Sequence, residues 1–166
     1  ILQVTERSLA TPILSGTNVP LLAVELRSIE GDVSISQLQF NIVGTAQTSE
    51  IASLRLLDGT GTIIDSKTPI TKTTSFTSSQ SIRIQEGTMV SLSIVGDISS
   101  SSGSTVGITF VDNGITASTG TLQPAVVNKV VMPSTYPLGY VGLVPSGVVI
   151  DGGFEEWTTA ESDPQG

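Results

Sequence analysis

The side chains that could perform chemistry in this sequence are mainly carboxylates. The 166 residues include 15 Asp and Glu, but no Cys and no His. Thiolate catalysis, Ser–His triads, disulfide bonds and zinc sites built from thiolates or imidazoles are therefore excluded. Two kinds of carboxylate chemistry remain, namely acid–base catalysis by a pair of carboxylates and the binding of a hard cation such as Ca²⁺.

Aspartates at the ends of predicted strands are the candidate calcium ligands, because Ca²⁺ is bound by oxygen atoms. Asp is also common in turns for another reason, since its side chain bonds to the nearby backbone. The sequence has no D-x-D-x-D-G run, so an EF-hand loop is excluded. Calcium is the one cofactor that we consider. The candidates are Asp58, Asp97, Asp112 and Asp151, and Asp65 has a similar position.

The adjacent carboxylates Glu155 and Glu156 do not form a catalytic pair. Neighbouring side chains of a strand point to opposite faces, whereas glycosidase chemistry needs two carboxylates around one cleft. Gly59-Thr60-Gly61 predicts a turn and not a phosphate-binding loop, because no helix follows it. We therefore expect a protein that is not an enzyme.

Aromatic residues are few, and three of them lie near the C-terminal end: Tyr136, Tyr140 and Trp157. They could stack on a sugar, or they could pin an extended segment against the rest of the protein. Both interpretations stay open at this point, and the first makes polysaccharide a possible partner.

The charge is unevenly distributed. The net charge is −8, yet residues 151–166 alone carry five acidic and no basic residues. The rest of the chain is close to neutral, and no basic patch predicts nucleic-acid binding. No apolar run is long enough to span a bilayer. The chain begins at Ile1 and ends in turn-forming residues, so we expect a segment of a longer polypeptide, cut either naturally or by experimental choice.

Short runs of alternating apolar and polar residues, separated by turn residues, predict strands throughout residues 11–119. The apolar parity changes near Ser36-Gln37, which predicts a β-bulge. Asp58–Gly61 and Asp112–Gly114 each predict a hairpin turn. The predicted strands are 22–27, 33–43, 51–57, 62–65, 73–77, 82–84, 90–94, 106–110 and 115–118.

This pattern predicts an all-β fold, an antiparallel Ig-like β-sandwich with an extended Pro/Gly-rich C-terminal segment. We expect an N-terminal strand or arm at 1–10 and the sandwich at 11–119. A linker with one possible extra strand would occupy 120–147. The last part, 148–166, would be a terminal strand with an acidic tail, either the start of a second module or a strand that pairs with another subunit.

The segment from Val19 to Ser118 resembles Ig-like modules of secreted and cell-surface proteins of bacteria and archaea. The resemblance rests on Leu22–Leu26, Asp32–Ile35 with Leu38–Phe40, Leu54–Gly59, Ile82–Ile84 and Leu92–Ile98. It implies a β-sandwich that serves as a spacer or packing unit outside the cell. The run Ile150–Trp157 is similar to the first strand of family-9-like carbohydrate-binding domains, and covers only the beginning of such a domain.

Two functions are consistent with these observations. The first is a structural subunit of an extracellular filament, sheath or surface layer, whose partners are copies of itself or adjacent modules of the same polypeptide. Its terminal apolar strands would then join neighbours by β-strand addition. The alternative is an adhesin stalk or a carbohydrate-binding accessory module. The assembly residues expected for the first function are Ile1, Leu2, Val4, Val148, Val149 and Ile150.

Overall fold

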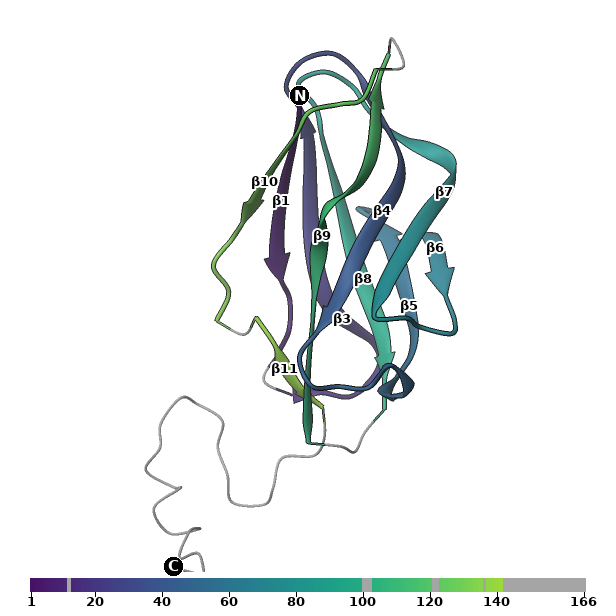
Figure 1. The fold of residues 1–166 in the computed structure, drawn as a ribbon, viewed down its shortest axis with the longest axis vertical. Coiled ribbons are helices and arrows are strands. Elements are labelled where there is room, and N and C mark those ends of the chain that lie inside the picture. Colours follow the sequence, from purple (N-terminus) through teal and green to yellow (C-terminus); the bar gives the residue numbers. More distant parts are fainter. Residues whose placement is uncertain (12, 100–102, 121–122, 136, 142–166) are drawn as a thin grey trace, which may run out of the picture.

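The computed structural model describes residues 1–11, 13–99, 103–120, 123–135 and 137–141 (Figure 1). These residues form two β-sheets and one 3-10 helix, Thr48–Glu50. None of the helical residues in these ranges builds a helix that could cross a membrane. The predicted all-β sandwich is confirmed.

The two sheets have six and five strands. The six-stranded sheet has the order β10-β1-β3-β8-β5-β6, and the five-stranded sheet has the order β2-β11-β9-β4-β7. The bounds in the first sheet are Val127–Val131, Leu2–Ser8, Gly16–Ser28, Met89–Ile98, Ile51–Asp58 and Ile63–Lys67. The bounds in the second are Ile13–Leu14, Gly139–Val141, Ser104–Thr119, Val33–Val43 and Thr73–Ile84.

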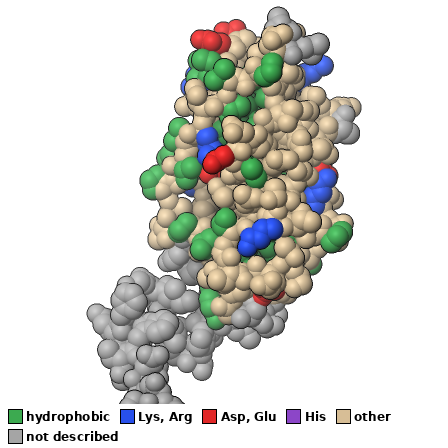
Figure 2. Space-filling view, in the orientation of Figure 1, with side chains coloured by type: hydrophobic (Ala, Val, Ile, Leu, Met, Phe, Trp, Pro, Cys, Tyr) green, Lys and Arg blue, Asp and Glu red, His purple; other side chains and the backbone are tan. Residues whose placement is uncertain are grey.

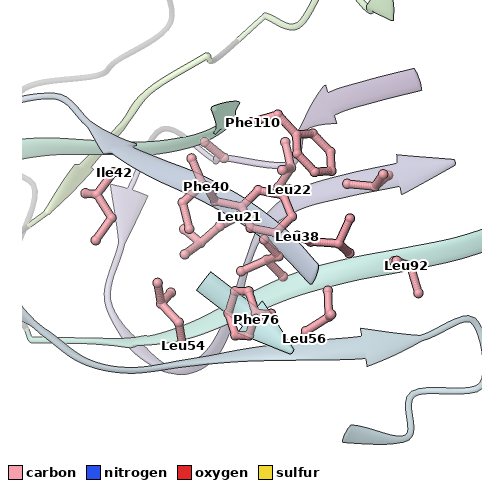
Figure 3. Close-up of a cluster of buried hydrophobic side chains, with 14 of the residues drawn as sticks. Leu21, Leu22, Leu38, Phe40, Ile42, Leu54, Leu56, Phe76, Leu92 and Phe110 are labelled. Atoms are coloured by element: carbon pink, nitrogen blue, oxygen red, sulfur yellow. The ribbon is translucent and has the colours of Figure 1, made fainter. Parts of the chain in front are cut away.

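The inward side chains of both sheets form one aliphatic core with a small aromatic centre (Figure 3). The Phe40 ring lies 4.2 Å from the Phe110 ring and 5.8 Å from the Phe76 ring, the second pair edge to face. Leucines from the opposite sheet, including Leu54 and Leu56, surround this centre and are fully buried. Burial of this aliphatic surface is the main stabilising contribution, since the chain has no disulfide.

Two local predictions are confirmed in detail. The β4 strand carries the predicted bulge, because Ile35 pairs with Ala117 and Gln37 with Thr116, which leaves Ser36 as the extra residue. The predicted hairpin at Asp58–Gly61 joins β5 to β6. Its turn is closed by the Asp58 carboxylate, which accepts hydrogen bonds from the backbone N–H groups of Thr60 and Thr62.

The hairpin predicted at Asp112–Gly114 is wrong. β9 continues through these residues to Thr119 and pairs with β4 on both sides of them. Phe110 lies opposite Phe40 and Ile115 opposite Leu38, so residues 111–114 bulge out opposite Gln39 alone. Asn113 adopts the left-handed conformation (φ 59°) that its sequence suggested, but the turn serves a bulge and not a chain reversal.

The N-terminal strand or arm predicted at 1–10 lies in the sandwich as the strand β1. β1 pairs antiparallel with β3 on one side and parallel with β10 on the other. Leu2 and Val4 are fully buried in the core. These apolar residues face inward with the strand period, so β1 is a central strand of its sheet and offers no free edge.

The linker predicted at 120–147 contains strands of both sheets. The extra strand anticipated there exists as β10, next to β1. β11 then crosses to the other sheet and pairs with β9 and β2. The sandwich therefore extends from Leu2 to Val141, beyond the predicted limits of 11 and 119. Val148, Val149 and Ile150 lie outside the described residues.

The position of β1 in the core predicts the effect of two substitutions on this strand. Leu2→Ala removes a buried side chain and is expected to lower the free energy of unfolding by about 3 kcal/mol. Arg7→Ala changes an exposed side chain and is expected to cost less than about 0.5 kcal/mol. Urea denaturation followed by circular dichroism measures both values. Equal, small effects would restore the arm interpretation.

Candidate interaction site

The two sheets separate along one side of the sandwich, between β10 and β9. β11 pairs with β9 only at residues 104–106. Farther along, Ala125 donates to the Ala117 carbonyl and closes the other end of the gap. Within the described residues, β9 has no strand partner on this side between those points. We call this opening the side cleft, and it is bounded by β10 and by residues 107–115 of β9.

The side cleft contains two hollows. The first has a volume of about 380 Å³, and the second about 320 Å³. Apolar side chains of the first hollow are Phe110, Val111, Ile115, Ala125 and Val127. Apolar side chains of the second are Leu22, Val43, Ile108, Val131, Met132, Pro133, Pro137 and Leu138. On the face shown in Figure 2, hydrophobic side chains reach the surface along the side where Figure 1 places β10.

The outer edge of β10 is open. Leu2 donates its N–H to the Val126 carbonyl, and Met132 donates to the Glu6 carbonyl, both at 2.8 Å. In a parallel ladder with this register, alternate residues of β10 bond to β1. The main-chain groups of Val127, Lys129 and Val131 therefore point away from the sheet.

Exposed apolar side chains accompany this open edge. Four residues along β10 and its ends are between 44% and 63% exposed, although each is Val or Met: Val126, Val130, Val131 and Met132. Natural sheet edges usually carry charges, prolines or covering segments that prevent pairing with another chain. The one charged side chain of β10 is Lys129, and it points inward to an ion pair.

Glu6 closes the opposite edge of the side cleft. Its side chain comes from β1, crosses the interior and is 2% exposed. Its carboxylate accepts hydrogen bonds from the Phe110 backbone N–H and the Thr109 hydroxyl, both at 3.0 Å. A buried N–H at a strand edge needs an acceptor, and Glu6 supplies it. An incoming strand consequently finds the β9 edge occupied at Phe110 and the β10 edge free.

Lys129 divides the cleft into its two hollows. Its ammonium group lies 3.7 Å from the Glu6 carboxylate and 3.5 Å from the Asp112 carboxylate. The bulge at 111–114 brings Asp112 to this position. A Cβ on Gly114 would lie 2.8 Å from the Val111 Cβ and 2.9 Å from the Gln39 Cβ, so the close approach within the bulge needs glycine.

The aspartates considered for calcium are dispersed. The Asp58 carboxylate closes its own turn, and hydrogen bonds from Thr60 and Thr62 lower its pKa. Asp97 binds Arg55, and Asp65 binds Lys67. The described part of the chain holds no group of three potential carboxylate ligands, and Asp151 lies outside it. Calcium binding stays a prediction.

Asp97 is the centre of a polar network at one end of the six-stranded sheet. Arg55 donates to both carboxylate oxygens, Ser53 donates at 2.7 Å, and the Asn18 N–H donates at 3.0 Å. These donors stabilise the ionised form, so the pKa of Asp97 lies far below its usual value of 3.8. Both carboxylate oxygens that a cation would use are thus engaged with protein donors.

Of the three aromatic residues proposed to stack on a sugar, the structure describes Tyr140 alone. It lies half-buried on β11, beside the turn at Gly103. Tyr136 and Trp157 lie outside the described residues, so a shared sugar platform stays a prediction.

Sequence reasoning missed the two residues that organise the side cleft, Glu6 and Lys129. A signal for Glu6 was present, because it continues the inward-facing series Leu2, Val4, Glu6. A carboxylate at a core position requires buried donors. Nothing in the local sequence identified Lys129 as its partner, since the parallel pairing of β10 with β1 joins distant parts of the chain.

The hydrogen bonds of Glu6 predict that two carboxylates of the same cluster, Glu6 and Asp112, contribute unequally to stability. Glu6→Ala leaves the buried Phe110 N–H without its acceptor and is expected to cost about 3 kcal/mol of stability. Asp112→Ala removes a side chain that is 93% exposed and is expected to cost less than about 0.5 kcal/mol. Urea denaturation measures the free energy of unfolding of both variants. Equal losses of stability would contradict the proposed role of Glu6.

The lowered pKa of Asp97 predicts a pH-dependent contribution to stability. Because the pKa is lower in the folded state, the contribution is present above the usual value of 3.8 and is lost as the pH falls through the folded pKa. Asp97→Asn is expected to lower the Tm by about 2–4 °C near neutral pH. Calorimetry should show this difference in Tm shrinking below about pH 3. A difference that is independent of pH would refute the assignment.

Comparisons with known proteins do not identify a family for the chain. No protein-family model and no curated protein matches it. Among solved structures, a chain of a CaDoc0917–CaCohA2 complex at pH 5.5 is similar with a TM-score of 0.46 and 9% identity, over 87% of this chain and 100% of that one. The seventh ScaB type I cohesin from Pseudobacteroides cellulosolvens has a TM-score of 0.42 and 12% identity, over 87% and 95% of the two chains.

Proposed function

We propose that this protein is a non-catalytic module of an extracellular assembly, and that it binds a neighbouring protein chain by β-strand addition along β10. The observation that carries the proposal is the open edge of β10, whose outward main-chain groups at Val127, Lys129 and Val131 run beside two hollows. The hollow at Val131 is mainly apolar, and the hollow at Val127 is lined by both apolar and polar side chains.

An extended peptide matches this site better than a compact small molecule does. Strand addition takes its affinity from a row of main-chain hydrogen bonds and its specificity from pockets that receive alternate side chains. The side cleft offers both, because the free edge of β10 and the two hollows lie along the same line. The exposed Val130 and Met132 extend the apolar surface that a partner strand would cover.

A non-catalytic role is supported by the way in which the carboxylates are used. Asp58 and Asp97 accept hydrogen bonds that hold turns and strands in place. Glu6, the buried carboxylate of the side cleft, is likewise engaged by the Thr109 hydroxyl and the Phe110 N–H. The extracellular setting is supported by the strand pattern, which resembles Ig-like modules of secreted proteins.

The partner in this proposal is a second copy of the chain, or an adjacent module of the same polypeptide. A contact in which one surface of a copy meets a different surface of the next copy does not close on itself. It produces open chains, which fits the proposed filament, sheath or surface layer.

The proposal predicts that Val131→Pro weakens self-association. Proline removes an N–H that points away from the sheet, so the ladder between β10 and β1 stays intact. We expect sedimentation velocity to show concentration-dependent oligomers of the wild type. Val131→Pro should weaken their association about tenfold or more, equivalent to ~1.4 kcal/mol.

Val131→Ala is the matched control, because it shortens the same side chain but keeps the N–H. It is expected to associate as the wild type does, and circular dichroism should show that both variants fold. A folded Val131→Pro that assembles normally would contradict edge pairing, as would a wild type that stays monomeric up to its solubility limit.

A further inference from the structure

We infer that the strand received by β10 is the segment 150–154 of a second copy, with Ile150 and Phe154 entering the two hollows and Gly152 passing over Lys129. This inference rests on the proposed function and deepens it, because it names the segment that binds.

The side cleft sets a pattern for any incoming strand. The inward positions of β10 are Val127, Lys129 and Val131, and the hollows lie beside the first and the last of these. The middle position is filled by Lys129 and its ion pairs. Since alternate residues of a strand share a face, the partner needs two large side chains four residues apart, with an apolar one for the hollow at Val131, and a small residue midway.

The sequence Ile150-Asp151-Gly152-Gly153-Phe154 has this pattern. Ile150 and Phe154 supply the apolar side chains, and Gly152 leaves space for Lys129. The outward face would carry Asp151, a charged residue suited to solvent. One other run after β11, Val144-Pro145-Ser146-Gly147-Val148, has the same spacing but smaller side chains at its two ends.

The direction of β11 favours a second copy over the same chain. β11 runs antiparallel to β9, and its register takes it from Val106 toward Ser104, away from the side cleft. Val141 lies opposite Ser104, outside the cleft, and residues 142–149 could span up to about 26–29 Å to reach the cleft of a second copy.

The test combines two full-length variants that are defective in different halves of the contact. Phe154→Asp places a charge in an apolar hollow and leaves the β10 edge intact. Val131→Pro has a blocked edge and an intact segment 150–154. Sedimentation velocity should show each variant alone as a monomer, with association weakened about tenfold or more. An equimolar mixture should form a one-to-one dimer that grows no further.

Gly153→Asp is the matched control, because it introduces the same charge next to Phe154, at a position that the proposed strand directs away from the hollows. It is expected to assemble as the wild type does. Equal loss of assembly in Gly153→Asp and Phe154→Asp would overturn the pattern argument.

The outcomes separate the inference from the function on which it rests. If Phe154→Asp assembles normally and Val131→Pro does not, edge pairing stands and the named segment is wrong. If the mixture stays monomeric, the named segment is likewise wrong. If Val131→Pro assembles normally, both proposals fall together. A monomeric wild type, including one that holds its own segment in its own cleft, also overturns both.

Discussion

The arrangement of the sandwich depends on one buried carboxylate. The Phe110 N–H lies at an edge of β9 that no described strand covers, and an unpaired N–H in this position would be costly. Glu6 reaches it from the opposite sheet and also holds Lys129 of β10. A single side chain of β1 therefore connects the two sheets and orients the strand at the edge. Glu6 lines the second hollow and Lys129 the first, so this contact borders both hollows of the cleft.

On both open sides of the sandwich, a carboxylate of one sheet accepts a hydrogen bond from a backbone N–H of the other sheet, but the strand edges differ. On the far side, the Asp65 carboxylate of β6 accepts a hydrogen bond from the Thr77 N–H of β7 at 2.8 Å, so a carboxylate again ties one sheet to a strand edge of the other. There the two edge strands approach each other directly. At Glu6, a longer side chain from the second strand of the sheet makes the contact, and β10 extends past it. The extra strand is what leaves an acceptor edge on one side of the molecule.

Local features of this fold could be read from the sequence, and features that join distant segments could not. The alternation in β8 and the parity change at Ser36 depend on neighbours along the chain, so both predicted their structures correctly. Asp112-Asn113-Gly114 has the composition of a hairpin turn, yet pairing with β4 on both sides overrides that preference. The place of β1 was missed for the same reason, because its partner β10 lies near the other end of the described chain.

The pairing of β1 with β10 has a consequence for the order of folding. Contacts between distant parts of a chain form slowly, because a long loop must be closed before they contribute. β10 lies near the end of the described chain and docks on a strand at its beginning, so the edge that it presents does not exist in partly folded protein. In the proposed assembly, the β10 edge would therefore become available late in folding.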